Sequence, residues 1–210
     1  MKRILFYVAI PTVAFVLLSF FVNLGIENDS SAATDTVSLE TDVSAAMTFS
    51  ITTGDTVDFG TLTPGTPILA PSSGTIATCT TSAANGYTLG LHDGVASTDS
   101  ALLHTDASTR IADYAGTIGT PTSWTGTGLG ITLFAADINK EAKWGTGTTY
   151  NDANNKYAGI PETATTAHTV TGYHAGADTS SWAFELDAPS SQKTGTYSGS
   201  VTFTATAVLT

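Results

Sequence analysis

The sequence predicts an all-β fold built as a β-sandwich, and three observations predict it. About forty of the 210 residues are threonine, whose branched side chain suits a pleated surface. Only 12% of the residues are charged, so the lysines and glutamates typical of exposed helices are scarce. Roughly eight short stretches alternate apolar with polar residues, and clusters of glycine, proline, asparagine and serine separate them. This spacing is typical of a sandwich of two sheets.

The clearest alternation occupies the end of the chain, residues 196–209. Apolar or small side chains stand at every second position from Tyr197 to Leu209, and hydroxyl side chains stand between them. Successive side chains of a strand point to opposite faces, so the pattern predicts one long, half-buried strand.

Earlier stretches supply the other predicted strands. These cover residues 34–45, 47–51, 75–81, 87–91, 129–133, 169–173 and 182–186. Asn-Gly readily takes positive φ, so Asn85-Gly86 predicts a hairpin from Cys79 to His92. Ile111 and Tyr114 are expected as inward-facing anchors, and residues 137–143 as a single helical turn.

The first 26 residues predict a targeting segment. Lys2 and Arg3 precede an apolar run that ends at Ile26, and Ser31-Ala32-Ala33 offers the small residues that signal peptidase requires. The run is also just long enough to span a bilayer, so cleavage near Ala33 and retention as an anchor both stay open. Either outcome predicts an exported protein, at the cell surface or outside the cell. The expected organisation is a signal or anchor over 1–33, an extension over 34–44 and a sandwich domain over 45–210.

Charge and cysteine content narrow the function classes. The formal net charge is −11 and the basic residues after Thr34 are scattered, so nucleic acid is not an expected partner. Contact with a membrane is expected only through residues 1–26, if they are not removed. Cys79 is the only cysteine, so no internal disulfide can form. It is either a small core residue or, in an exported chain, the site of a bridge to another molecule.

No set of residues predicts catalysis, a metal site or a cofactor. The four histidines lack metal-ligand spacing, and the sequence has no P-loop, nucleophile elbow or dinucleotide-binding glycine motif. Asp55, Asp58 and the loop at 151–155 carry oxygen ligands that suit calcium, but they lack the spacing of an EF-hand. We interpret them as turn residues and expect a protein that is not an enzyme.

Four stretches resemble the spore coat protein U family, whose members include archaic chaperone–usher pilins. Residues 57–65 read Val-Asp-Phe-Gly-Thr-Leu-Thr-Pro-Gly, residues 78–89 contain Thr-Cys-Thr and Gly-Tyr-Thr-Leu, residues 143–147 read Lys-Trp-Gly-Thr-Gly, and residues 195–202 read Gly-Thr-Tyr-Ser-Gly-Ser-Val-Thr. They follow the family's order over about Thr48 to Leu209. Gly199 stands where the family has an aspartate, and residues 47–51 offer no cysteine to pair with Cys79.

The resemblance implies an immunoglobulin-like sandwich that lacks one strand. A neighbouring subunit's N-terminal segment would supply that strand by strand addition. Residues 34–43 alternate as such a donor requires, with the inserted side chains expected to be Val37, Leu39 and Val43. The acceptor groove is expected beside the last strand, at Tyr197, Val201 and Phe203. The protein would then be the structural subunit of a cell-surface fibre or fimbrium, a homopolymer assembled with a chaperone.

Two other functions fit the sequence. Trp124 and Trp144 lie in glycine-rich loops, and exposed aromatic rings on a sandwich can stack on sugars. This pattern predicts a secreted carbohydrate-binding or adhesin module, whereas Trp182 alternates with Phe184 and Leu186 and is expected in the core. The remaining hypothesis is a monomeric surface protein held by an uncleaved N-terminal helix.

Overall fold

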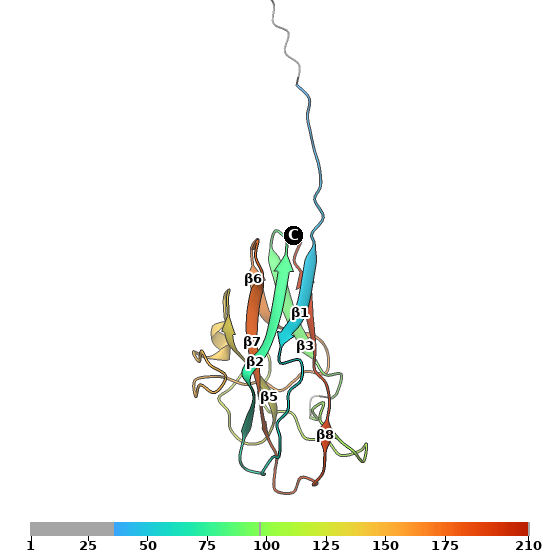
Figure 1. Ribbon diagram of the computed structural model, residues 1–210, viewed down its shortest axis with the longest axis vertical. Helices are drawn as coiled ribbons and strands as arrows, with labels where there is room; N and C mark the ends of the chain where they lie inside the picture. The colour runs from blue at the N-terminus through green and yellow to red at the C-terminus, as the bar shows by residue number, and fades with distance from the viewer. Residues whose placement is uncertain (1–35, 97, 210) are drawn as a thin grey trace, which may run out of the picture. The chain divides into compact units, whose positions relative to one another are not determined.

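The structure, a computed structural model, describes residues 36–96 and 98–209. The chain divides into two units, Met1–Asp42 and Val43–Thr210. In the first unit, the described residues 36–42 are exposed and belong to no helix or strand. In the second unit the described regular structure is all β, apart from one short 3-10 turn, η1 (Ala142–Trp144), as Figure 1 shows. All strand pairs are antiparallel.

The larger sheet has four strands in the order β1-β2-β7-β5. Their bounds are β1 (Met47–Thr53), β2 (Ile68–Thr81), β7 (Asp178–Asp187) and β5 (Gly128–Ala136). Trp182, Phe184 and Leu186 of β7 are buried, as their alternation predicts. The neighbouring β5 is buried over most of its length, which fits its central apolar run.

The smaller sheet has three strands in the order β6-β3-β9. Their bounds are β6 (Thr165–Thr171), β3 (Gly86–His92) and β9 (Thr202–Ala207), and a separate two-stranded ladder joins β4 (Leu103–His104) to β8 (Tyr197–Ser198). Along β9 the threonines are exposed and the residues between them are half-buried. The predicted alternation of faces is therefore confirmed for β9.

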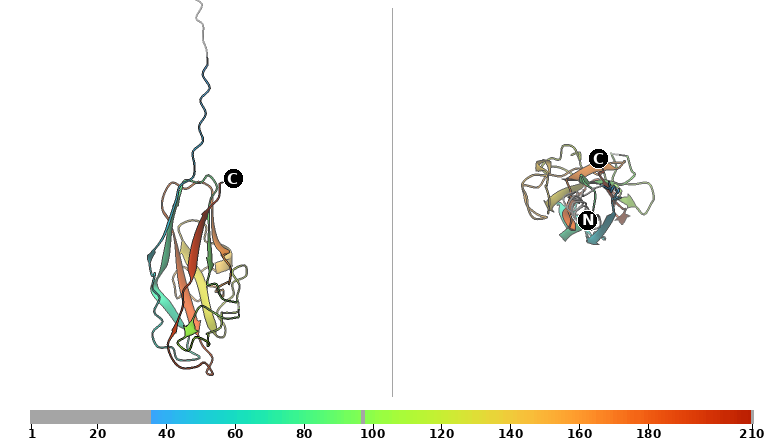
Figure 2. Two further views of the ribbon diagram at one scale, coloured as in Figure 1. Left: turned by 90° about the vertical axis from the view of Figure 1, so that its right-hand side faces the viewer. Right: turned by 90° about the horizontal axis from the view of Figure 1, so that it is seen from above.

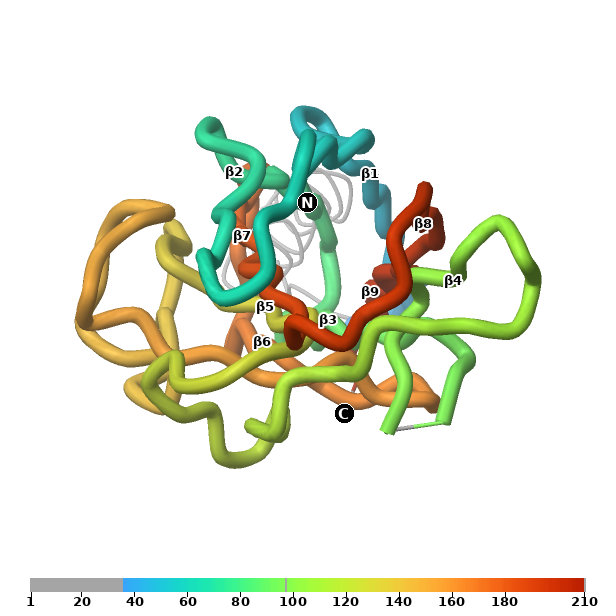
Figure 3. The backbone as a smooth tube through the Cα atoms, turned by 90° about the horizontal axis from the view of Figure 1, so that it is seen from below, coloured from blue at the N-terminus to red at the C-terminus, as the bar shows by residue number. Residues whose placement is uncertain are grey.

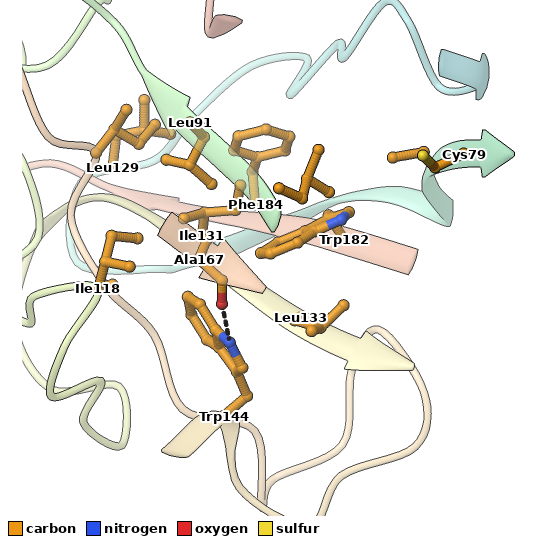
Figure 4. Packing of buried hydrophobic residues seen from close by; sticks show 14 of the residues in the cluster. Cys79, Leu91, Ile118, Leu129, Ile131, Leu133, Trp144, Ala167, Trp182 and Phe184 are labelled. Carbon is orange, nitrogen blue, oxygen red and sulfur yellow. Dashed lines mark hydrogen bonds between the residues drawn. The ribbon is translucent and has the colours of Figure 1, made fainter. Parts of the chain in front are cut away.

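Side chains from both sheets meet in one hydrophobic cluster, part of which is drawn in Figure 4. Leu91 of β3 and Ile131 of β5 are both 0% exposed, and burying such a side chain stabilises the fold by about 1.5–3 kcal/mol. The rings of Trp182 in the larger sheet and Phe203 in the smaller one lie 5.7 Å apart, centroid to centroid. The predicted anchors Ile111 and Tyr114 are buried too.

The predicted hairpin from Cys79 to His92 is wrong. The turn is present and Gly86 has φ of +81°, but β2 pairs with β1 and β7, whereas β3 pairs with β6 and β9. The chain therefore crosses from one sheet to the other at residues 82–85. An alternating pattern specifies which face of a strand is buried but not which strand lies beside it.

The predicted single strand over 196–209 is also wrong in one respect, because it breaks into β8 and β9. Its first part leaves the smaller sheet to pair with β4. At Gly199 an added Cβ would lie 2.2 Å from the carbonyl oxygen of Ala101. Only a glycine permits this approach, which gives a physical reason for a glycine at position 199.

The N-terminal predictions have mixed outcomes. Residues 36–46 are not part of any strand, so the strand expected over 34–45 is absent from the described portion of that range. The predicted targeting segment and the site of cleavage lie outside the described residues. Over residues 36–96 and 98–209, no helix has the length and hydrophobicity needed to cross a membrane.

Candidate functional site

A groove with both polar and apolar lining reaches β1 of the larger sheet at Ile51 and β9 of the smaller one at Phe203. It consists of two adjoining cavities of about 210 Å³ and 620 Å³, which share the lining residues Val57, Phe59, Leu102 and Gly199. Figure 3 looks at the second unit from below and shows β1 and β9 on the same side of it, away from β5 and β6. The smaller cavity lies between these strands at Ile51 and Phe203, and residues 57–62 and 192–199 line the larger one.

The walls of the groove are half-buried apolar side chains that pack against the core. Ile51 at the end of β1 forms one wall of the smaller cavity, and Val201 and Phe203 form the other. Leu129 and Phe184, both buried core residues, line its floor. Apolar surface that reaches the core without being covered is costly in water, so burying it in a complex is favourable.

Among the described residues, β1 pairs only with β2, and β9 pairs only with β3. The backbone N–H and C=O groups on the outer edges of both strands therefore lack strand partners. Such edges are templates for another strand. Ile51 of β1 and Phe203 of β9 both line the smaller cavity, so the two open edges reach the groove there.

The other two edges of the sheets are covered. The edge of β5 is paired outside the named strands, since Ile131 and Ala158 exchange two backbone hydrogen bonds of 2.8 and 2.9 Å. On β6, the Glu141 carboxylate accepts a 2.8 Å hydrogen bond from the N–H of Thr169, and the Trp144 indole donates one of 3.0 Å to the carbonyl of Ala167. The open edges at the groove are thus a local feature and not the general state of these sheets.

Residues 36–46 form an extended segment with exposed apolar side chains. Val37, Leu39 and Val43 are 79%, 90% and 87% exposed. They stand at odd positions, whereas Ser38, Glu40 and Asp42 occupy even ones. A strand with this alternation has one face suited to an apolar groove and one suited to water.

The three predicted acceptor residues all lie along the groove. Val201 and Phe203 line the smaller cavity and Tyr197 lines the larger one. The Tyr197 hydroxyl donates a 2.7 Å hydrogen bond to the carbonyl of Lys193 and accepts one of 2.8 Å from Gln192. Its ring packs edge-on to His104, with centroids 5.0 Å apart, so Tyr197 holds the end of the groove in place.

Sequence reasoning missed the opposite wall. Ile51, Val57, Phe59 and Leu102 line the groove, but they come from three separate segments. The alternation of β1 predicted a strand with an apolar face, and it gave no sign that this face would stay partly uncovered.

The expectation that Trp144 is an exposed sugar-stacking residue is wrong. Its side chain is 0% exposed, its ring lies edge-on to Trp182 at 5.6 Å, and its indole nitrogen is hydrogen-bonded to Ala167 (Figure 4). Trp124 is half-buried. One face of its ring is stacked on Tyr114 at 4.5 Å, and Tyr157 packs against it edge-on at 5.4 Å. Trp144 therefore presents no exposed ring face, and Tyr114 already covers one face of the Trp124 ring.

Two titratable groups outside the groove, Glu141 and His168, are engaged in a structural contact. His168 is 1% exposed and its Nδ1 lies 2.7 Å from Glu141 Oε2. Burial alone would raise the pKa of Glu141, but the hydrogen bond and charge of His168 lower it overall. Within the described part of the chain, no group of three or more His, Cys, Asp or Glu side chains could hold a metal ion.

The acidic residues considered for calcium act in turns. Asp58 accepts a 2.8 Å hydrogen bond from the N–H of Gly60, and Asp152 accepts one of 2.9 Å from the N–H of Asn154. These short-range contacts are those of aspartate in turns.

The chain was compared with family models, with curated proteins and with solved structures, and none of the three comparisons found a match.

Proposed function

We propose that this chain is an exported structural subunit that forms a cell-surface fibre by β-strand addition. In this proposal residues 45–210 form an immunoglobulin-like sandwich that lacks one strand. Residues 34–44 of a second copy supply that strand. The protein is not an enzyme and needs no cofactor.

The observation that supports this function best is the groove between the unpaired edges of β1 and β9. A strand that enters it gains backbone hydrogen bonds from the edges and buries its apolar face against Ile51, Val201 and Phe203. Most surface grooves offer only one of these two sources of affinity.

The N-terminal segment matches the groove in length and pattern. The stretch 37–43 is comparable in length to β9, which has six residues. Val37, Leu39 and Val43 are spaced to enter the groove from one face, while Glu40 and Asp42 stay in water. The three large apolar side chains of this segment are exposed to solvent. Burying them in the groove is favourable by about 0.025 kcal/mol per Å² of apolar surface.

The experiment compares the exported chain that begins at Thr34 with a form that begins at Ala45. Size exclusion and negative-stain microscopy are expected to show polymers of the first and monomers of the second. A synthetic peptide of residues 34–44 is then added to the shorter form. It is expected to bind and to raise the melting temperature, because ligands of the folded state stabilise it.

Two variant peptides provide matched controls. Leu39→Asp places a charge on the apolar face of the peptide and is expected to weaken binding at least tenfold. Ser38→Asp places the same charge on the opposite face and is expected to leave binding nearly unchanged. Fibre assembly in cells can depend on helper proteins. Binding of the peptide to the shorter form, and not fibre formation, therefore decides whether the proposal holds. If the peptide neither binds nor stabilises the shorter form, the proposal is wrong, and the anchored monomer becomes the leading hypothesis.

A further inference from the structure

A second exposed apolar surface lies at one end of the Val43–Thr210 unit. The described residues include five large apolar side chains that are well exposed, three of which belong to residues 37–43. The other two are Tyr173, 63% exposed, and Leu209, 59% exposed. We define the apical surface as residues 82–86, 171–177 and 208–209.

Hydrogen bonds hold the parts of the apical surface together. The N–H of Val208 donates to the carbonyl of Gly86 at 2.9 Å, and Gly86 stands opposite Thr171 in the register of β3 and β6. At Gly86 an added Cβ would lie 3.0 Å from the carbonyl oxygen of Gly172. Leu209 and Tyr173 therefore follow directly on segments that both touch Gly86. Figures 1 and 2 show these connections at the same end of the unit.

The start of β1 belongs to the same end. The N–H of Ala46 donates a 2.8 Å hydrogen bond to Ser82 Oγ, and its carbonyl accepts a 3.0 Å one from the N–H of Ser82. The chain that precedes β1 therefore departs beside the apical surface. Only residues 44–46 separate Val43 from β1, and they span at most about 11 Å when extended.

The apical surface lacks net charge, although the chain as a whole carries −11. Its loops contain alanine, glycine, serine, threonine, asparagine and Tyr173, together with His174, whose Nδ1 lies 2.5 Å from the buried carboxylate of Asp178. Two acidic molecules repel each other least where their surfaces are uncharged. This end is therefore where a second copy can approach at low electrostatic cost.

We infer that the apical surface of one copy packs against the next copy at residues 58–64 and 193–196, the end of the groove where the larger cavity lies. This inference rests on the proposed function. If residues 37–43 occupy a neighbour's groove with Val43 at the end where the larger cavity lies, the short connection at 44–46 brings the apical surface to that end of the groove. The larger cavity of the groove, which residues 58–62 and 192–199 line, lies toward the end of the unit where β8 is found (Figure 1).

This contact joins two different surfaces, so it can repeat from copy to copy, and it produces an open polymer when the rotation between copies does not close into a ring. Tyr173 and Leu209 are its apolar centre. It adds a second interface to strand addition and restricts the angle between successive subunits, which makes the fibre stiffer and slows the release of subunits.

Polymers of the exported chain that begins at Thr34 test the inference. The variant Tyr173→Ser/Leu209→Ser removes the apolar side chains, and Tyr173→Phe keeps the ring as a matched control. The double variant is expected to release subunits on dilution roughly tenfold faster than the wild type, and the control at the wild-type rate. Both are expected to bind the 34–44 peptide normally in the form that begins at Ala45.

A photo-crosslinking amino acid at position 173 gives a second measurement that does not depend on the double variant. In polymers it is expected to crosslink to residues 58–64 or 193–196 of another copy. Wild-type release rates in the double variant, or crosslinks confined to other regions, would overturn the apical contact and leave strand addition standing. If the wild type forms no polymers and the peptide does not bind, both proposals fail.

Discussion

Cys79 lies opposite Phe49 in the register between β1 and β2 and is 2% exposed. Burial, followed by the charge of Asp178, raises the pKa of its thiol to about 11, so at neutral pH it is protonated and a poor nucleophile. The position that faces it on β1 holds an aromatic ring. Of the two roles that the sequence left open, the structure favours the buried core residue over a bridge between molecules.

Glu185 is a second residue whose environment departs from what its type predicts. It lies on β7, is 7% exposed and pairs in register with Leu69 and Gly130. Burial is the main cause that raises the pKa of its carboxyl to about 7, the Tyr157 hydroxyl acts in the opposite direction, and the charge of Asp187 raises it further.

The raised pKa of Glu185 predicts a pH-dependent stability. In the unfolded chain the carboxyl ionises near pH 4.5, whereas in the folded protein it ionises near pH 7. Its contribution to the free energy of unfolding is therefore complete below about pH 4.5 and is lost as the pH rises through 7. The Glu185→Gln variant has no carboxyl group to titrate at this position. Its free energy of unfolding minus that of the wild type should therefore increase between pH 4.5 and pH 8, on the order of 1–3 kcal/mol.

Urea unfolding of both proteins at several pH values measures this difference. Asp113 is also affected, because burial raises the pKa of its carboxyl to about 8, but its contribution is common to both proteins and cancels in the comparison. A difference that stays constant over this pH range would show that Glu185 ionises normally in the folded protein.

At the scale of single elements, the start of β9 and the residue just before it allow a matched test of the groove. Val201 and Thr202 are neighbours, but Val201 is half-buried and lines the groove, whereas Thr202 is exposed. Val201→Asp is expected to weaken binding of the 34–44 peptide at least tenfold, because the charge must be desolvated when the groove fills. Thr202→Asp is expected to change it by less than threefold.

Isothermal titration of the form that begins at Ala45 gives both affinities. Circular dichroism establishes that each variant is folded. Equal losses in the two variants would place the binding site away from the inward face of β9.

The elements also show how far sequence reasoning extends. The alternation of β9 was sufficient to predict its half-buried face, because side-chain period is a local property of a strand, whereas β7 is buried on both faces from Trp182 to Asp187. Alternation was insufficient for the hairpin after β2, since a partner strand is chosen by packing over the whole fold. Trp144 was assigned by its glycine-rich surroundings, yet the turn at η1 directs its ring inward, where Ala167 satisfies the indole N–H.

For the candidate site, the family resemblance directed attention to Tyr197, Val201 and Phe203, and these do line the groove. The wall made by Val57, Phe59 and Leu102 could not be predicted, because it is assembled from segments up to about 45 residues apart. The open edges of β1 and β9 are likewise a property of the tertiary structure, visible only when all strand partners are known.

At the scale of the whole molecule, charge should govern how fast copies associate. The first 33 residues hold two basic and two acidic residues, so the chain from Thr34 onward keeps the formal charge of −11. The segment that would enter the groove is itself acidic at Glu40 and Asp42. Two such molecules repel each other, and salt reduces this repulsion as the screening length falls from about 30 Å at 0.01 M to about 8 Å at 0.15 M.

We therefore expect the rate at which the 34–44 peptide binds the shorter form to rise several-fold between 0.01 M and 0.15 M salt. The dissociation rate should change little, because apolar burial and backbone hydrogen bonds hold the bound strand. A peptide with Glu40→Gln and Asp42→Asn should bind faster at low salt and respond less to its addition. Stopped-flow fluorescence of a labelled peptide measures both rates. A binding rate that falls with salt would instead reveal attraction between the segment and a basic site near the groove, with Lys193 the first residue to substitute.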